Sequence, residues 1–428
     1  MHLLFAAAMA LTQQWLLVSD LHLNPFDRSP AAAAYGSDTN WPLLRSAIAA
    51  MRKAQPQPQA IVIAGDLLAH QWSAKAQAAR QDPTRAAARA MSDIARAFNT
   101  AFPRAQFVLA LGNNDDPCGD YRAAAGTPYL SAVARAWEPL VNRHGASPAF
   151  ARDFSNTGYY TALLPGGVRM VVLDDVYWSL FFRPCRRGVN AGNAQMGWLD
   201  QTLRSLKPGE SAVPLMHIPP GVDAVSTLLA QRFVIVPYWR ADARVRFTRE
   251  LARFASRIPF ALAGHTHRTD FRLAGSTPLL IAAAISPIYS NNAAFMTLAV
   301  GARGALENYH VFSFDPRSGD WQQTFAFNRA YGVHGFNLKD VLRVHERIES
   351  DPALRRVWEL STVSNSDAWY SVRASWTAHW CAQTAVGGQY SACAGDQRRT
   401  AVLPVLAGMA LVLAVLVAVW YSRKRLWT

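Results

Sequence analysis

The sequence predicts an α/β fold in which strands alternate with helices, followed by a helical C-terminal part and one apolar terminal helix. Three observations lead to this prediction. Short apolar runs are separated by amphipathic segments, a strand-rich stretch follows Thr269, and helical periodicity returns at about Asn337. Strand–helix–strand units imply parallel strands in a sheet that is covered by helices. The chain has 428 residues, of which 51% are hydrophobic, so it can bury a substantial core.

The predicted elements alternate regularly from the start. Residues 15–19, 60–64 and 107–111 have the length and apolar character of buried strands. Helical patterns separate them at residues 41–54, where Asn40 is a suitable N-cap, and at residues 84–98. Further strands are expected at 167–175, 212–217 and 259–267, with helices at 195–206 and 241–258 between them. The later strand-like runs predict antiparallel hairpins that complete the sheets, at 270–275, 278–284, 294–300, 309–315 and 321–327.

Residues 331–398 are predicted to form a separate helical part. We place the main domain at residues 14–330 and a helical subdomain with a cysteine pair at 331–398. Trp369, Trp376 and Trp380 are spaced seven and four residues apart, which puts them on one face of a helix. We expect that face to pack against the main domain, with a membrane-facing or substrate-facing stripe as the alternative.

The two ends of the chain predict export and anchoring. Residues 401–421 contain no charged side chain, and about 20 apolar residues span a bilayer core. Trp420, Tyr421 and the basic residues that follow predict a transmembrane helix at 400–422 with a cytoplasmic tail at 423–428. The main domain would then lie on the extracytoplasmic side, either periplasmic or extracellular. Residues 1–10 end in a small-x-small pattern, which predicts the end of a signal peptide unless the true start lies upstream.

The four cysteines are an even number, and in an exported protein they can form two disulfides. Cys381 and Cys393 are close in sequence, which favours pairing them and leaves Cys118 with Cys185. The sequence leaves the other two pairings open.

The formal net charge of +14 has two explanations. The Arg residues are scattered along the chain, which favours a general compositional bias. Attraction to phosphate-bearing ligands or anionic lipid headgroups is the alternative. No basic-aromatic module appears in the sequence, so we expect no specific recognition of nucleic acid.

Metal-capable side chains follow five of the predicted strands. In open α/β sheets, ligands bind at the carboxyl ends of the strands, so these side chains should meet at one edge. Burying so many carboxylates and imidazoles without a cation would be costly. The candidate ligands, in chain order, are Asp20, His22, Asp66, Asn113, His217, His265 and His267.

The mixture of ligand types indicates the chemistry. Imidazole, carboxylate and amide oxygen together suit zinc, iron or manganese. Two such ions about 3.5–4 Å apart can activate a bridging hydroxide and neutralise charge on an in-line phosphoryl transition state. The residues therefore predict a phosphoester hydrolase with two divalent metal ions, zinc first among them.

The polar residues that follow these strands resemble, in their order and spacing, the motifs of the calcineurin-like metallophosphoesterases. Those motifs are D-x-H, G-D, G-N-H-[DE], a single His and G-H-x-H. The resemblance covers about residues 15–327. It implies an αββα sandwich, that is, two mixed sheets flanked by helices, with a dinuclear site at the strand ends. It also implies that Asp66 bridges the two metals. One metal would be held by Asp20, His22 and His267, and the other by Asn113, His217 and His265.

A narrower resemblance is to the acid sphingomyelinase-like phosphodiesterases. It rests on "GDLLAH", "GYYT", "HIPPG" and "ISPIYSNNAAF". That branch is zinc-dependent, disulfide-bonded and secreted or lumenal, and it hydrolyses phosphodiesters of lipids or nucleotides, so the expected substrate is a phosphodiester. Endopolyphosphatases share the general plan and can carry G-N-N-D, which leaves an endopolyphosphatase or a phosphomonoesterase as the alternative. A non-catalytic scaffold is disfavoured because every ligand position is filled.

Asn114 departs from the commoner pattern, which has a histidine at this position. An amide can hydrogen-bond phosphate but cannot donate a proton as an acid. His70 then becomes the candidate general acid, with a purely structural role as the alternative. We expect substrate contacts from Asn114 and His70, and from Tyr289 and Asn291 in the "SPIYSNN" segment, where turn formation explains the asparagine equally well.

Overall fold

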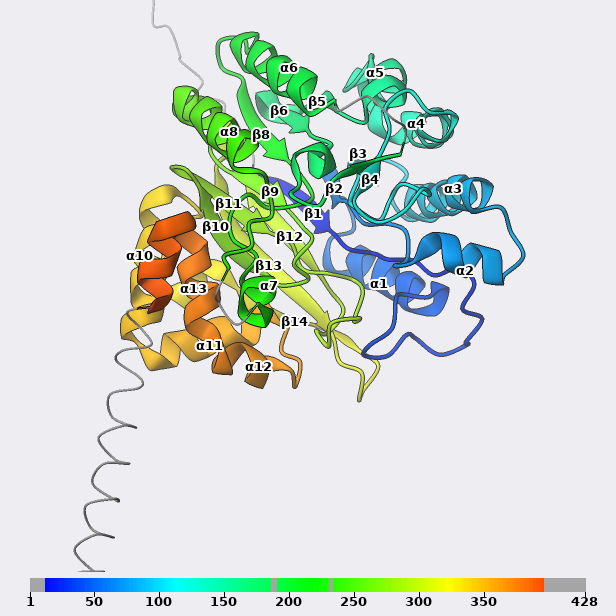
Figure 1. The fold of residues 1–428 in the computed structure, drawn as a ribbon. Helices are drawn as coiled ribbons and strands as arrows, with labels where there is room; N and C mark the ends of the chain where they lie inside the picture. The colour runs from blue at the N-terminus through cyan, green and yellow to red at the C-terminus, as the bar shows by residue number, and fades with distance from the viewer. Residues whose placement is uncertain (1–11, 186–190, 231–233, 396–428) are drawn as a thin grey trace, which may run out of the picture. The chain divides into compact units, whose positions relative to one another are not determined.

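The computed structural model describes residues 12–185, 191–230 and 234–395 (Figure 1). The chain divides into two compact units. The first unit consists of residues 1–221 and 237–374, and the second of residues 222–236 and 375–428. All the candidate site residues belong to the first unit. The boundary that we placed between residues 330 and 331 stays a prediction.

The first unit contains two six-stranded mixed sheets and one short two-stranded sheet. The first sheet has the order β14-β13-β12-β1-β2-β3 and the second β10-β11-β9-β8-β6-β5. The strands of the first sheet are β1 (Gln13–Val18), β2 (Ala60–Ala64), β3 (Gln106–Ala110), β12 (Ala294–Val300), β13 (Leu306–Phe314) and β14 (Trp321–Ala326). Those of the second are β5 (Tyr160–Leu164), β6 (Val168–Val172), β8 (Ser211–Leu215), β9 (Ala261–Ala263), β10 (Asp270–Ala274) and β11 (Thr277–Ile281). The short sheet pairs β4 (Arg122–Ala123) with β7 (Arg183–Pro184).

Strand pairing fixes which ends of the strands meet. In the first sheet β1, β2 and β3 are parallel, with Trp15 opposite Ala60, and β12 runs antiparallel to β1. In the second sheet β6, β8 and β9 are parallel. The two sheets are linked where the hydroxyl of Tyr160 bonds both the amide and the carbonyl of Leu109, at 2.8 and 3.1 Å, on the free edge of β3. The carboxyl ends of the parallel strands therefore share one edge of the sandwich.

Helices flank the sheets, as the sequence predicted (Figure 1). Helices α6 and α8 bury Met196, Leu199, Phe247 and Leu251 against the second sheet. The helices of the first unit are α1 (Trp41–Ala54), α2 (Trp72–Ala78), α3 (Pro83–Ala101), α4 (Pro128–Val141), α5 (Phe150–Thr157), α6 (Gly192–Arg204), α8 (Ala241–Arg253), α9 (Phe327–Tyr331), α10 (Leu338–Ser350), α11 (Pro352–Thr362) and α12 (Trp369–Ala374). Those of the second are α7 (Ala224–Leu229) and α13 (Trp376–Thr384). The prediction of two mixed sheets flanked by helices is confirmed.

Local sequence explains where the first long helices begin. The side chain of Asn40 accepts a hydrogen bond from the amide of Leu43 at 3.2 Å, as its N-cap position predicts. Asp82 caps α3 in the same way through the amide of Arg85 at 2.8 Å, and Pro83 occupies the first helical position. These caps fix where the chain leaves the loop between β1 and α1 and the turn between α2 and α3.

The predicted tryptophan stripe is wrong. Helix α12 ends at Ala374 and α13 begins at Trp376, so residues 369–380 do not form one continuous helix. Without that continuity the spacing of seven and four does not place the three rings on one face. The side chain of Trp369 also lies outside the described residues.

The predicted membrane anchor is corrected. Among residues 12–185, 191–230 and 234–395, no helix is both long and apolar enough to cross a bilayer. The segments at 400–422 and 423–428 and the predicted signal peptide at 1–10 lie outside the described residues. The extracytoplasmic placement that rested on this anchor is not retained.

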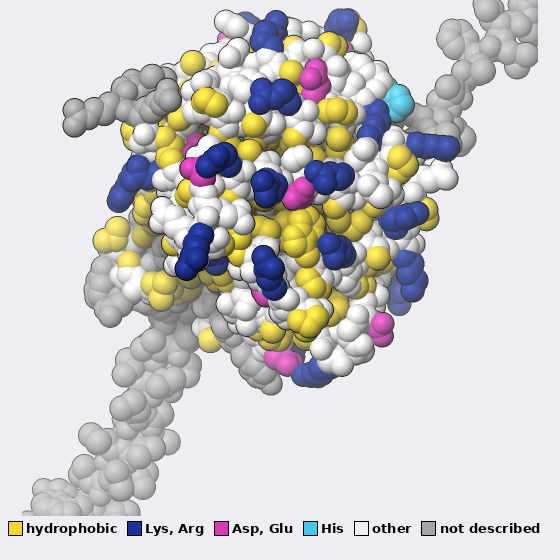
Figure 2. Space-filling model, turned by 90° about the vertical axis from the view of Figure 1, so that its right-hand side faces the viewer, with side chains coloured by type: hydrophobic (Ala, Val, Ile, Leu, Met, Phe, Trp, Pro, Cys, Tyr) yellow, Lys and Arg dark blue, Asp and Glu magenta, His cyan; other side chains and the backbone are white. Residues whose placement is uncertain are grey.

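Basic side chains are spread over the surface that Figure 2 shows. On this face, Lys and Arg residues are separated from one another by apolar and neutral patches. The exposed arginines of the chain include Arg45 and Arg52 of α1 and Arg96 of α3. Arg96 pairs with Asp93 at 3.1 Å on the same helix. This arrangement agrees with the scattered pattern that the sequence showed.

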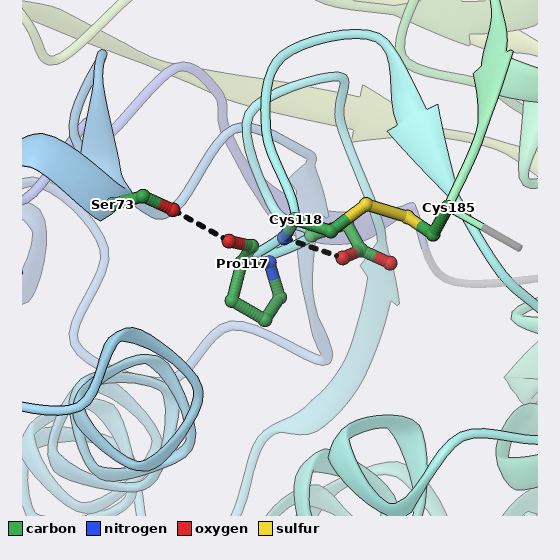
Figure 3. The surroundings of a disulfide bond; sticks show 5 residues. Ser73, Pro117, Cys118 and Cys185 are labelled. Carbon is green, nitrogen blue, oxygen red and sulfur yellow. Dashed lines mark hydrogen bonds between the residues drawn. A yellow bond between two sulfur atoms is a disulfide. The ribbon is translucent and has the colours of Figure 1, made fainter.

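Both disulfides that the sequence favoured are present. Cys381 and Cys393 are joined within the second unit. Cys118 and Cys185 join the loop after β3 to the chain just beyond β7, with their Cα atoms 6.2 Å apart (Figure 3). In the same loop, the amide of Cys118 bonds Asp116 at 2.9 Å, and the carbonyl of Pro117 accepts a hydrogen bond from Ser73 at 2.6 Å. The loop after β3 is thus tied at one end to α2 and at the other to β7.

The longer disulfide should contribute more to stability than the shorter one. It closes a separation of 67 residues, against 12 for the other. Loop-closure entropy assigns about 4 kcal/mol to the first and about 3 kcal/mol to the second. We expect C118A/C185A to lower the denaturant midpoint more than the matched variant C381A/C393A. An unchanged midpoint in C118A/C185A would show that the cross-link does not constrain this loop.

Candidate metal centre

The seven candidate ligands meet at the shared edge of the two sheets. Asp20 and His22 follow β1, Asp66 follows β2 and Asn113 follows β3, while His217 follows β8 and the two remaining histidines follow β9. Six of the seven side chains are buried, and His265 is half-buried. Five strand ends from two sheets therefore deliver buried polar groups to one place, as the sequence predicted.

Three of these residues form the first cluster. The Nε2 atoms of His22 and His267 lie 3.0 Å apart. Oδ1 of Asp20 lies 3.4 Å from Nε2 of His267 and 3.8 Å from that of His22. One carboxylate and two imidazoles thus point at a common centre.

A second cluster lies beside the first, and Asp66 faces both. Nε2 of His217 is 3.1 Å from Oδ1 of Asn113 and 3.2 Å from Oδ2 of Asp66. The same oxygen of Asp66 is 3.4 Å from Nε2 of His22 in the first cluster. His265 brings a ring nitrogen within 4.8 Å of the ligand atoms of Asp66 and His217. Asp66 is therefore in position to bridge two cations.

The spacing of these atoms fits cations. Metal–nitrogen bonds of about 2.0–2.1 Å with tetrahedral angles place neighbouring ligand atoms about 3.3 Å apart. The observed separations of 3.0–3.8 Å bracket that value. Within the described residues, Nδ1 of His267 is buried with no hydrogen-bond partner, so the imidazole of His267 is held on one side only. The donor set and its geometry therefore fit two divalent ions.

Burial and the neighbouring carboxylates shift the pKa values of two of the candidate ligands in opposite directions. Burial would lower the pKa of His217, but the carboxylate of Asp66 raises it to about 10. Burial lowers the pKa of His267 to about 3, against the opposing attraction of Asp20. Metal binding requires neutral imidazole, so a cation entering this site must displace protons.

Backbone carbonyls orient the ligand imidazoles. Nδ1 of His22 lies 3.1 Å from the carbonyl of Leu68, and Nδ1 of His217 lies 2.7 Å from that of Ala64. Each contact turns Nε2 toward the cluster. The Nδ2 group of Asn113 donates to Asp120 at 2.7 Å, which directs Oδ1 of Asn113 toward His217.

Two buried carboxylates hold the backbone around the ligands. Asp115 accepts hydrogen bonds from the amides of Leu67, Leu68 and Gly112 at 2.7, 3.0 and 2.8 Å. Asp175 accepts from the amides of His217 and Ile218 at 2.9 Å each. Asp115 lies within a motif that the sequence analysis used. Asp175 was not singled out, and its only signal was its position at the end of the apolar run predicted as a strand at 167–175.

The backbone at the ligands is unusual. Five of the seven candidates have positive φ, from 42° to 72°: Asp20, His22, Asp66, His265 and His267. Left-handed backbone is rare for residues other than glycine, and it clusters at functional sites. Gly112 allows the close approach of β3, because a Cβ atom there would overlap the carboxylate of Asp66. The sequence motifs alone do not reveal this backbone geometry.

The predicted substrate-side residues occupy different positions. Asn114 donates its backbone amide and its Nδ2 group to the carboxylate of Asp66, at 2.8 Å each. His70 stacks on His22 with ring centroids 3.9 Å apart. Tyr289 is 62% exposed and lies edge-on to His267 at 4.7 Å, whereas Asn291 is buried and donates to the carbonyl of Ser286 at 3.0 Å. Their contacts with substrate stay predictions.

The chain is similar to several known proteins. Acid sphingomyelinase-like phosphodiesterase 3b of Homo sapiens is 24% identical and covers 94% of this chain and 94% of its own length. Sphingomyelinase phosphodiesterase D of Dictyostelium discoideum is 24% identical over 61% of this chain, which spans 57% of that relative's length. A dimetal phosphatase structure from Danio rerio covers 70% of this chain and 95% of its own, at 12% identity and a TM-score of 0.44.

The family assignment rests on the match to a whole family. The Calcineurin-like phosphoesterase family matches residues 15–269, which is more than half of the chain and includes all seven candidate ligands. The chain therefore belongs to the calcineurin-like phosphoesterases.

Proposed function

We propose that the protein is a metal-dependent hydrolase of phosphoester bonds with a dinuclear site, and that its substrate is a phosphodiester. The observation that carries the proposal is Asp66, whose Oδ2 atom lies within 3.4 Å of an imidazole in each cluster. Family membership and the phosphodiesterase names of the relatives support the reaction class. An endopolyphosphatase or phosphomonoesterase activity remains the alternative.

In this proposal each cluster holds one cation. The first is held by Asp20, His22 and His267, and the second by Asn113, His217 and His265, with Asp66 between them. Zinc is the proposed metal because imidazole dominates the set, and iron or manganese would also suit it. Two such ions would supply Lewis acidity, which lowers the pKa of water and neutralises charge on the phosphoryl group.

The chain's own residues would bind the phosphate and assist departure of the leaving group. Asn114 lies against Asp66, so a phosphate at the metals would come within reach of its amide group. An amide can donate a hydrogen bond to a phosphate oxygen but cannot supply a proton to the leaving oxygen. His70, beside His22, is the proposed general acid.

Metal content tests the ligand assignment. After loading with Zn²⁺ and desalting, the wild-type chain should retain two equivalents by elemental mass spectrometry. D66A should retain fewer than one because it removes the bridge, and H217A should retain about one. H144A, which alters an exposed histidine away from the clusters, is the control and should retain two. A wild-type chain that holds no divalent ion would contradict the assignment.

Hydrolysis tests the proposed reaction. The metal-loaded chain should cleave bis-p-nitrophenyl phosphate, and chelation should abolish that activity until metal is restored. H217A should lower kcat/KM by at least about 10²-fold, since the metals supply most of the charge stabilisation. A panel of polyphosphate, nucleotides and phosphomonoesters then separates the alternatives. A preference for polyphosphate or a monoester over every diester would replace the proposed substrate class.

A further inference from the structure

A buried carboxylate that the sequence analysis did not single out contacts the proposed general acid. Oδ1 of Asp38 lies 2.7 Å from Nδ1 of His70, and the Asp38 side chain is only 3% exposed. The other oxygen of Asp38 accepts a hydrogen bond from Nζ of Lys75 at 2.7 Å. The same Nζ atom donates to the carbonyl of His70 at 2.7 Å. Asp38, His70 and Lys75 thus form a closed three-membered network.

This network determines which nitrogen of His70 faces the metal centre. An ionised carboxylate only accepts hydrogen bonds, so the contact with Asp38 holds a proton on Nδ1 of His70. Nε2 is then the free ring atom, and the hydroxyl of Tyr289 lies 3.5 Å from it. The ring also stacks on His22 at an interplanar angle of 19°. The ring of His70 is therefore held at its edge by the hydrogen bond with Asp38 and on its face by stacking with His22.

The backbone that carries His70 is fixed as well. Gln71 has a φ of 53°, which turns the chain sharply between His70 and α2. Ser73, in the first turn of α2, donates to the carbonyl of Pro117, next to the Cys118–Cys185 disulfide (Figure 3). The charge of Lys75 also offsets that of the buried Asp38. The carboxylate therefore aims an imidazole that has little freedom to move.

We propose that Asp38, supported by Lys75, is a positioning residue that holds Nδ1–H of His70 and presents Nε2 to the leaving oxygen of the substrate. The inference rests on the proposed function and assigns the role that Asn114 cannot fill. The transfer uses the form of His70 with a proton on both ring nitrogens: the Nε2 proton passes to the leaving oxygen as that oxygen's bond to phosphorus breaks and a bond from the attacking water oxygen to phosphorus forms. The departing group leaves as a neutral alcohol or phenol, and His70 remains as a neutral imidazole with Nδ1–H bonded to Asp38. Asp38 keeps its own charge throughout and touches neither substrate nor metal.

The alternative is a structural tie between the loop before α1 and the start of α2. Both roles predict some loss of stability on substitution, so stability alone does not separate them. They differ in how the loss of activity depends on the leaving group. A proton supplied by His70 matters greatly when the leaving group is basic and little when it is a good leaving group.

The experiment compares D38N, K75M and H70A with the wild type on two diesters. Bis-p-nitrophenyl phosphate has a good leaving group, and diphenyl phosphate has a more basic one. With diphenyl phosphate, we expect kcat to fall about 10²-fold in H70A and at least about tenfold in D38N. With bis-p-nitrophenyl phosphate, the fall in kcat should be at least about tenfold smaller than with diphenyl phosphate in each variant. D38N should keep the wild-type KM and metal content, and K75M should show a weaker form of the D38N effect.

Two control variants distinguish the positioning role of Asp38 from a purely structural one. E210Q disrupts another buried ion pair, with Arg169 at 3.0 Å, at the amino end of β8 and so away from the metal centre. It should leave the ratio of the two rates unchanged. In the double variant D38N/H70A, the loss should equal that of H70A alone, because Asp38 acts through His70.

Nitrogen NMR of histidine-labelled protein provides a readout that is independent of activity. The His70 signals, assigned by their loss in H70A, should show the proton on Nδ1 in the wild type and a mixed or reversed tautomer in D38N. A wild-type proton on Nε2 alone, equal losses on both diesters, or an additive D38N/H70A loss would overturn the positioning role. A wild-type chain that binds metal but cleaves neither ester would overturn the proposed function and this inference with it.

Discussion

The structure depends on one constraint, the burial of the Asp66 carboxylate between imidazoles from two sheets. Its Oδ2 atom faces His22 from β1 and His217 from β8, and the side chain has almost no access to solvent. Such a group is stable only if positive charge lies beside it. The shared edge of the sandwich, the glycine at position 112 and the left-handed backbone of the ligands all serve this arrangement.

The residues that surround the candidate ligands have one feature in common. Buried carboxylates there hold donors in place: Asp115 and Asp175 hold backbone amides, and Asp38 holds an imidazole. Each removes freedom from a group that faces the metal centre and so helps to fix the orientation of the candidate ligands.

The sequence predicted the two mixed sheets, and the edge at which the candidate ligands meet, because both depend on local signals. Apolar runs marked the strands, and the polar residues directly after them marked the shared edge. Asp38 was not predicted because it lies in a loop that is adjacent to no strand. It meets His70 only through tertiary folding. The tryptophan stripe failed because helical spacing does not reveal that the chain breaks at Ser375. The membrane anchor rested on composition alone, and no helix in the described part of the chain bears it out.

The distance between two bound metals tests the central claim most directly. X-ray absorption spectroscopy on the zinc-loaded chain, or anomalous diffraction from its crystals, measures that distance and the ligand atoms together. The account predicts two ions about 3.5–4 Å apart, bridged by Asp66 and surrounded by imidazole nitrogen and carboxylate or amide oxygen. A single ion, or two ions too far apart to share Asp66, would contradict it.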